Sequence, residues 1–505
     1  MNNEQFKIQF GDIPQKVRPS CRGVSPYLIF LLILLLPLNA FAIEIPGYEG
    51  GIQNETTYKE VIFVTGEPIV MEGTLTIKTK EKDNTVTETY TYKLENKALN
   101  AKLSRSITLK EILEPKGRQI TSTKTLEKYK ETIDINKKKY EVKDSHYQWN
   151  QGSIIHKTPL LSYYAGDYSA RKTYDINRGN ETLVVETVGN LVGYNGPWSA
   201  TETQTIEYIL SYEDKTNATN NWEGTATVEA SYNKTKDYSY AENIPHQISF
   251  RGGYRVTEKE ENILKYKYDL PKITGTQIGK GRNIGRESLY LDTNPNITRL
   301  NIPAVRDVLG HKYEEELLLL ASMEGLPLDT TSIGPSSPMS RGDFARALVK
   351  AMDIPIIKEE VKSRSRKKVE PPKPLFKDVG ENHRNFDYIE EVAKRDIMVG
   401  IDHSFNPDKP LSRVEAYATV IRILGFEALA PIQSYSLGYK DENLIQPWAK
   451  DYIYVAKELG FIEKSDYLYP NRELTKGEAA KLIVALINYM QDELRYDYME
   501  GILNQ

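Results

Sequence analysis

Near its C-terminus the chain repeats one short pattern three times: a helix-capping residue, a cation, any residue and an acid. The copies are Ser340-Arg341-Gly342-Asp343, Ser412-Arg413-Val414-Glu415 and Thr475-Lys476-Gly477-Glu478. A serine or threonine with an acid three residues later, followed by apolar residues at helical spacing, predicts the start of a helix. A cation in that first turn is mildly unfavourable, because a helix N-terminus already carries partial positive charge. The repeated cation therefore indicates a role beyond helix formation.

The residues around these turns also align, which predicts three related units. The second and third copies match at an offset of 63 residues, which aligns Phe376-Lys377-Asp378 with Tyr439-Lys440-Asp441. The first copy matches the second at an offset of 72, and the extra length falls in a polar, proline-flanked basic linker at 356–374. Each unit reads as a helix, a loop with proline and a capped helix. Units of this size bury little alone, so we expect them to pack together, as 291–355, 375–430 and 431–505.

These residues resemble the S-layer homology (SLH) family. The best single match is 376–421, which has the family's opening Phe-x-Asp-Val at Phe376, its Phe405-x-Pro407 and its Ser/Thr-Arg-x-Glu turn. The third unit adds PWAKDYI (447–453), similar to the family's tryptophan-alanine helix start, with Trp448. The resemblance covers about 300–490. The first unit departs from it, with no Phe-x-Asp-Val opening and with Asp343 in place of glutamate, and the third has Lys476 in place of arginine.

The resemblance implies a fold, a partner and a mode of binding. SLH units form an all-α pseudo-threefold bundle that holds a protein non-covalently to a secondary cell wall polymer, which often carries a pyruvate ketal and hence a carboxylate. We expect unpaired N–H groups at each helix start to attract that anion, and the adjacent cation to pair with it in an open crevice, bidentately where it is arginine. The residues predicted to bind the polymer are Ser340, Arg341, Asp343, Ser412, Arg413, Glu415, Thr475, Lys476 and Glu478, with Trp448 stacking on a sugar. Replacing Arg341 and Arg413 together by alanine should leave the fold intact and abolish sedimentation with cell walls.

The segment from about 50 to 290 alternates polar and apolar residues with the period of a β-strand. In 72–96 the alternation continues on both sides of Asp83-Asn84, which predicts a hairpin with Tyr90, Tyr92 and Leu94 on one face. EGTLTI (72–77) is echoed by EGTATV (223–228), and YTYKLEN (90–96) by YSYAEN (238–243). This echo predicts an internal duplication and two β-rich units, 43–205 and 206–290. The glycines and asparagines of 280–300 favour a connector.

The predicted fold class is thus multidomain, with an all-β antiparallel region, sandwich-like or a long twisted sheet, before the all-α bundle. The first 42 residues have the pattern of a secretory signal, with basic residues before the apolar run YLIFLLILLLPL (27–38) and with Ala40 and Ala42 at the cleavage site. An uncleaved anchor is the alternative. The only cysteine, Cys21, would be lost on cleavage, so the mature chain would have neither disulfides nor thiolate metal ligands. We expect a secreted protein of the cell wall.

No residues in 43–300 nominate a catalytic, metal or cofactor site. A formal net charge of −4 with nearly balanced acids and bases argues against a nucleic-acid binder. Two hypotheses remain for the β-rich region: a structural or adhesive module, or a polysaccharide-active enzyme, which would need two carboxylates about 5–10 Å apart in a cleft. The expected partners are the anionic polymer and other surface-layer proteins, with no nucleic acid and no membrane after signal cleavage.

Overall fold

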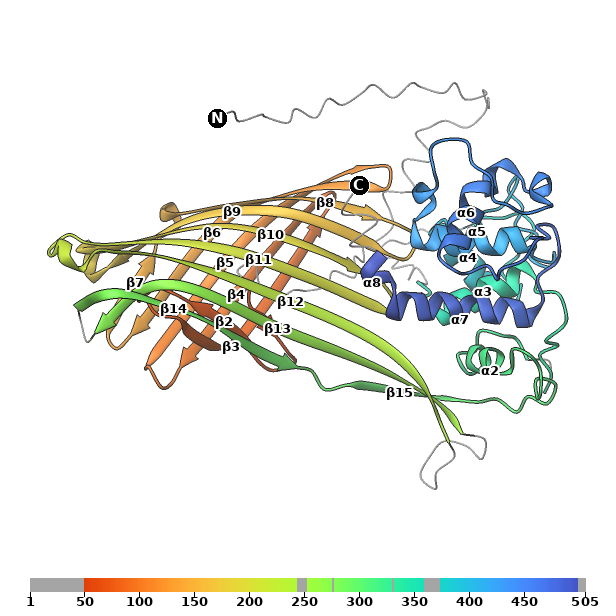
Figure 1. Cartoon of the computed structure of the whole chain (residues 1–505), viewed down its shortest axis with the longest axis horizontal. Coiled ribbons are helices and arrows are strands. Elements are labelled where there is room, and N and C mark those ends of the chain that lie inside the picture. The colour runs from red at the N-terminus through yellow and green to blue at the C-terminus, as the bar shows by residue number, and fades with distance from the viewer. Residues whose placement is uncertain (1–49, 243–251, 275–276, 329–330, 358–372, 498–505) are drawn as a thin grey trace, which may run out of the picture. The chain divides into compact units, whose positions relative to one another are not determined.

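A computed structural model of the protein describes residues 50–242, 252–274, 277–328, 331–357 and 373–497. The predicted signal peptide (1–42), with Cys21, and most of the predicted linker (356–374) lie outside the described residues. Two regions are described, a β-rich region and a helical region (Figure 1).

Fifteen strands of the described residues form one antiparallel sheet. Their bounds are β1 (Ile52–Gln53), β2 (Tyr58–Ile62), β3 (Ile69–Lys82), β4 (Thr85–Asn96), β5 (Ala101–Lys116), β6 (Gln119–Ile135), β7 (Lys138–Val142), β8 (Tyr147–Lys157), β9 (Ser162–Ile176), β10 (Glu181–Asn195), β11 (Ser199–Asp214), β12 (Trp222–Ala241), β13 (Gly253–Thr274), β14 (Gln277–Asp292) and β15 (Asn296–Asn301). Nearly every strand pairs with its neighbours in sequence, so the sheet is a long meander. β8 pairs with β6 and β9 alongside β7, and β15 returns to pair with β13.

The predicted hairpin is confirmed. Lys82 of β3 pairs with Thr85 of β4, which leaves Asp83 and Asn84 as a two-residue loop, and Asp83 has the positive φ of 54° that such tight turns need. Tyr90, Tyr92 and Leu94 are all buried on one face, as the alternation predicted. Local sequence pattern therefore set the pairing of these two strands correctly.

Other expectations about the β-rich region do not hold. The expected boundary at 205/206 lies inside β11, and strands on both sides of it belong to one sheet rather than to two separately bonded sheets of a sandwich. EGTLTI lies on β3 and YTYKLEN on its paired strand β4. Their echoes, EGTATV and the first four residues of YSYAEN, both lie on the single strand β12. The structure therefore does not repeat the β3–β4 hairpin. The predicted connector at 280–300 contains most of β14 and β15, because strand pairing with β13 continues through its glycines.

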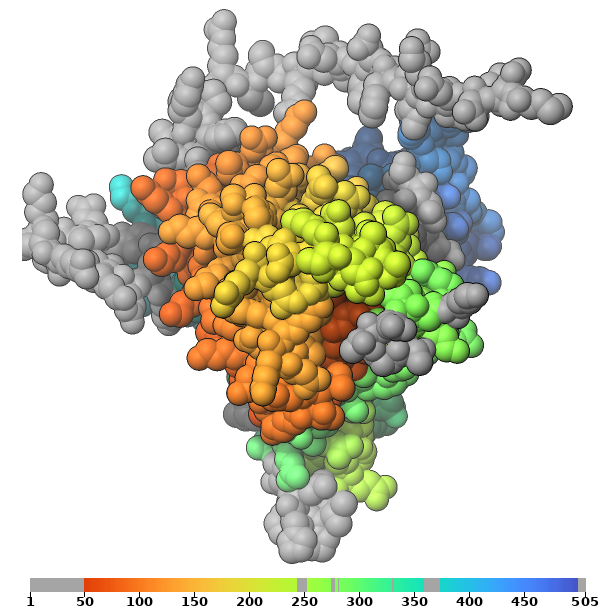
Figure 2. All heavy atoms as spheres, turned by 90° about the vertical axis from the view of Figure 1, so that its left-hand side faces the viewer, coloured from red at the N-terminus to blue at the C-terminus, as the bar shows by residue number. Residues whose placement is uncertain are grey.

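The core of the β-rich region lies on the inner, curved face of the sheet (Figure 1). The N-terminal segment 52–64 packs across this face: the ring of Phe63 lies 5.7 Å from that of Tyr208 in β11 and 6.3 Å from that of Tyr266 in β13. Tyrosine supplies many of these buried rings, since it combines a large apolar body with a hydroxyl that can bond polar neighbours. Figure 2 looks onto the end of the sheet away from the helices, where atoms of residues 50–240 (red to yellow-green) make up most of the visible surface.

The helical region consists of short helices joined by loops. Their bounds are α2 (Glu314–Ser322), α3 (Arg341–Ala351), α4 (Phe386–Lys394), α5 (Arg413–Leu424), α6 (Lys450–Glu458), α7 (Lys476–Asp492) and α8 (Leu494–Asp497). The three predicted helix starts are confirmed, with Ser340, Ser412 and Thr475 as N-caps of α3, α5 and α7. Among the described residues, no helix is both long and apolar enough to cross a membrane.

The two regions share a hydrophobic core and belong to the same compact unit of the chain. Side chains at one end of the sheet, from β11 and from the loops before β9 and β11, donate to carbonyls in the last turns of the three capped helices, groups that lack partners within a helix. These bonds are Trp198 Nε1 to Ala351 O of α3 at 2.9 Å, Thr158 Oγ1 to Ile423 O of α5 at 2.8 Å, and Ser199 Oγ to Met490 O of α7. The sheet therefore covers the C-terminal ends of α3, α5 and α7.

Candidate functional site

The segments that lead into the three capped helices meet one another. The N–H of Met339 donates to the carbonyl of Leu474, that of Leu474 to the carbonyl of Leu411, and that of Leu411 to the carbonyl of Met339, each at 2.8 Å. The ring closes with one residue from each unit, and all three side chains are buried. The three predicted site turns are thus brought together at one place.

The first N–H groups of each helix are used in this assembly. The first one donates to the neighbouring unit, from Arg341 to Lys409 O at 3.0 Å, from Arg413 to Arg472 O at 3.0 Å and from Lys476 to Ser337 O at 2.9 Å. The second does the same, from Gly342 to Pro407 O, Val414 to Pro470 O and Gly477 to Pro335 O. The third binds the N-cap side chain. The expectation that unpaired N–H groups at these helix starts attract the anion is therefore wrong, since neighbouring carbonyls already accept from them.

Three aspartates, which were not among the predicted site residues, hold the loops that supply these carbonyls. Asp378 accepts from the N–H groups of Phe405 and Asn406 at 2.9 and 2.7 Å, and Asp441 accepts from those of Leu468 and Tyr469 at the same distances. Although burial raises the pKa of Asp378, its backbone hydrogen bonds outweigh that effect and lower the pKa. These carboxylates fix the shape of each loop.

The first unit has the same device. Asp307 accepts from the N–H groups of Ile333 and Gly334 at 3.0 and 2.7 Å. Asp307 and Val308 are thus the counterparts of Asp378 and Val379. The first unit lacks the phenylalanine of Phe-x-Asp-Val, as predicted, since Val305 stands in its place, but it keeps the aspartate that the sequence alignment missed. The Asp-Val pair is visible in the sequence, but Asp307 and Asp378 are 71 residues apart, whereas the capped helix starts of the two units align at an offset of 72.

Arg341 of the first unit bonds three groups of the second unit. Its Nε and Nη2 donate to the carbonyls of Phe405 and Val399, and its Nη1 to Glu415 Oε1, all at 2.9 Å. The residue is only 9% exposed, and its guanidinium lies 5.0 Å from the centre of the Phe405 ring. The expectation of an open crevice at Arg341 is not met, because the side chain is held in internal bonds.

Arg413 occupies the equivalent position between the second and third units but is held much more loosely. Its Nη1 lies 3.6 Å from Glu478 Oε1, its Nη2 lies 3.4 Å from the hydroxyl of Tyr417, and its Nε has no hydrogen-bond partner among the described residues. Its side chain is 17% exposed, against 11% for the side chain of Arg341. The Nη groups of Arg413 are therefore less strongly bonded within the chain than those of Arg341.

Lys476 completes the cycle from the third unit to the first. Its Nζ donates to Ile333 O at 2.7 Å, the one hydrogen bond that this three-donor group makes to the described residues. A capping box forms at Ser412/Glu415 and at Thr475/Glu478. In the first unit Asp343 does not return to its cap. It is buried and accepts instead from Arg384 and Asn385, which ties α3 to the loop before α4.

Comparison with known families identifies two of these units. A family model for the S-layer homology domain matches residues 375–416 and 438–480. The chain carries S-layer homology domains. No curated protein matches the chain. The family indicates a surface protein that is anchored non-covalently to a cell wall.

The matched S-layer homology domains contain most of the predicted site. Ser412, Arg413 and Glu415 lie in the first match, and Trp448, Thr475, Lys476 and Glu478 lie in the second. Ser340, Arg341 and Asp343 lie outside both matches. Trp448 is half exposed in a single turn before α6 and is the one predicted site residue outside the three helix starts.

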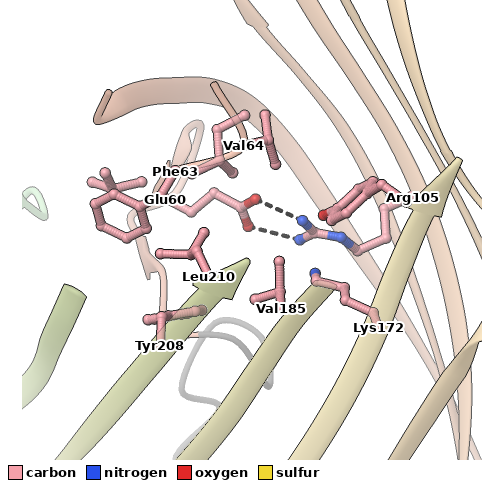
Figure 3. Close-up of a pocket in the computed structure, with 11 residues that line it drawn as sticks. Glu60, Phe63, Val64, Arg105, Lys172, Val185, Tyr208 and Leu210 are labelled. Carbon is pink, nitrogen blue, oxygen red and sulfur yellow. Dashed lines mark hydrogen bonds and ion pairs between the residues drawn. The ribbon is translucent and has the colours of Figure 1, made fainter. Parts of the chain in front are cut away.

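Outside the S-layer homology domains, a second polar cluster lies inside the sheet (Figure 3). Arg105 of β5 makes two 2.9 Å bonds to Glu60 and a third bond to Glu131, and Lys172 lies 3.8 Å from Glu131. Although burial raises the pKa of Glu131, the two cations outweigh it and lower the pKa. The adjoining cavity is about 30 Å³, the space of a water molecule rather than of a sugar. Two carboxylates and two cations balance each other here, and the geometry suits a structural role.

Proposed function

We propose that the helical region binds an anionic, pyruvylated secondary cell wall polymer and that the β-rich region is a structural or adhesive module displayed from it. In this proposal the signal peptide at 1–42 directs export, and residues 303–352 act as a third S-layer homology domain that completes a pseudo-threefold bundle. The closed ring at Met339, Leu411 and Leu474 and the equivalent carboxylate of Asp307 support that third domain.

The observation that carries the binding proposal is the unused donor capacity of Arg413. Its Nη2 makes only a 3.4 Å hydrogen bond and its Nη1 only a 3.6 Å ion pair, so this partly exposed guanidinium can form a charge-assisted pair with a carboxylate without breaking a strong internal bond. Arg341 would have to give up three bonds of 2.9 Å to do the same. We therefore place the polymer's carboxylate in the groove between the second and third units, at Arg413.

The position of the sheet supports display of the β-rich region away from the wall. Because the sheet covers the C-terminal ends of α3, α5 and α7, the capped turns lie at the opposite end of each helix. At about 1.5 Å per residue, even the shortest of these helices separates the two ends by roughly 16 Å. Polymer bound at the turns would thus leave the sheet free to project outward.

The test is cosedimentation of the full chain with purified cell walls, before and after the walls are stripped of their secondary polymer. Arg413→Ala should lose binding, and Arg413→Lys should retain part of it because lysine keeps the charge but not the planar fork. Arg346→Ala is the matched control, since it removes the same charge from α3, where Arg346 Nε donates to the exposed carbonyl of Glu324. Unchanged binding by Arg413→Ala would reject the proposed site.

A further inference from the structure

The three loops before the capped helices share an unusual backbone position. Gly334, Asn406 and Tyr469 each precede a proline and have φ of 71°, 57° and 53°. In each, the N–H donates to the loop aspartate at 2.7 Å. The same carboxylate contact thus imposes the same left-handed conformation in all three units.

The residue types at this position are not equally suited to it. Glycine adopts positive φ without steric cost and asparagine is tolerated there, but a bulky residue such as tyrosine is an outlier. The side chain of Tyr469 gains no burial in return, because the residue is 54% exposed. Its presence in the third unit is therefore unfavourable for the fold alone, and strain of this kind is often kept for function.

The exposed ring of Tyr469 forms part of an aromatic surface. It stacks on Tyr467 with ring centres 5.5 Å apart and an angle of 22° between the planes, and Tyr467 is also exposed. The ammonium of Lys440 lies 5.5 Å from the centre of the Tyr467 ring. That ammonium is paired with Asp466 at 2.5 Å, so what this surface presents is two nearly parallel, exposed aromatic rings rather than a free positive charge.

This surface adjoins Arg413. Pro470, the residue after Tyr469, accepts from the N–H of Val414, and Arg472 accepts from that of Arg413. The loop that carries the two tyrosines therefore runs along the first turn of α5. The aromatic surface and Arg413 therefore both lie at the contact between the second and third units.

We infer that Tyr467 and Tyr469 form a saccharide-stacking subsite, which takes the apolar face of a pyranose ring in an anionic polysaccharide whose carboxylate is bound by Arg413. The inference rests on the proposed function and adds to it the part of the ligand that the arginine does not reach. Stacking on an aromatic face suits a sugar because its C–H groups line one side of the ring, whereas its hydroxyl groups point outward to water.

The strain makes a sharp test possible. Tyr469→Asn and Tyr469→Gly install the residues that the other two units use at this position, so they should keep or raise the thermal unfolding midpoint while they weaken binding of the full chain to solubilised wall polymer roughly tenfold. Tyr469→Phe should bind like the native chain. Tyr496→Asn, which removes an exposed tyrosine in α8, is the control for loss of a surface ring.

Arg413→Ala measured in parallel separates the two ideas. Loss of binding in Arg413→Ala with unchanged binding in Tyr469→Asn and Tyr469→Gly would overturn the subsite and leave the proposed function standing. Unchanged binding in all variants would reject both. Unchanged polymer binding with reduced self-association of the Tyr469 variants would instead assign the tyrosines to a contact between copies of the chain and would also overturn the subsite.

Discussion

Arg341 and Arg413 occupy equivalent positions in sequence, and the structure predicts opposite consequences for their removal. In Arg341→Ala, the carbonyls of Phe405 and Val399 and the carboxylate of Glu415 lose a donor at 2.9 Å. Breaking a buried charged pair of this kind costs about 3–5 kcal/mol, because the groups left behind are desolvated and unpaired. The side chain of Glu415 is 26% exposed, so water can reach it, and we expect the low end, about 3 kcal/mol.

Arg413→Ala removes fewer and weaker contacts than Arg341→Ala does. Its closest ionic contact is 3.6 Å and its Nε has no hydrogen-bond partner among the described residues, so the loss of stability should stay below about 1 kcal/mol. Calorimetric and urea unfolding of the full chain would compare the two variants directly. The sequence alone suggested that the double variant would keep its fold intact, but the structure predicts that it would not. Loss of wall binding in the double variant would therefore not identify the ligand site.

The comparison can fail in two ways. Equal stability losses in the two variants would refute the assignment of different roles. A neutral Arg341→Ala would show that the three bonds contribute nothing net, which would remove the argument that Arg341 holds the first and second units together. Arg341→Lys offers a further check, because one ammonium cannot satisfy three acceptors spread around a planar guanidinium and should restore only part of the stability.

Two further predictions concern buried charges of the sheet. Burial raises the pKa of Glu202 to about 7, so the folded chain retains a proton that the unfolded chain releases near pH 4.5. The free energy of unfolding should therefore fall as the pH rises from about 4.5 to about 7. Glu202→Gln should remove this dependence and gain about 3 kcal/mol relative to the native chain at pH 8 but little at pH 4, as measured by urea unfolding; parallel pH profiles would contradict the assignment. Arg105→Met should cost about 3–5 kcal/mol by leaving Glu60 and Glu131 short of their main cation. Lys234→Met, which breaks a pair with Glu258 whose side chains are 30% and 29% exposed, should cost under about 1 kcal/mol. Similar losses in the two variants would argue against a network that depends on burial.

Much of the local structure followed from the sequence. The three N-caps, the hairpin at Asp83-Asn84 and the inward row of Tyr90, Tyr92 and Leu94 were all predicted correctly. These features depend on residues within a few positions of one another, where a side chain either can or cannot reach its neighbour's backbone. The change from a period of two to a helical period likewise separated the β-rich region from the helical one.

The sequence-based predictions were wrong where hydrogen-bond partners far away in the sequence decide the structure. Glycines at 280–300 suggested a connector, yet pairing with β13 extends β14 through them. The motifs EGTATV and YSYAEN suggested a duplicated second β-rich unit. Instead one 20-residue strand, β12, contains both EGTATV and YSYA, because β11 and β13 supply hydrogen bonds along its length.

The same division applies to the candidate site. Composition and spacing alone determined that three helices begin with a cap, a cation and an acid. Only the tertiary structure decided that carbonyls of the neighbouring unit accept the first N–H groups, that each nitrogen of the Arg341 guanidinium has a partner and that Nε of Arg413 has none among the described residues. Donors and acceptors in a chain can be counted from its sequence, but which of them remain unpaired depends on which distant segments pack beside them.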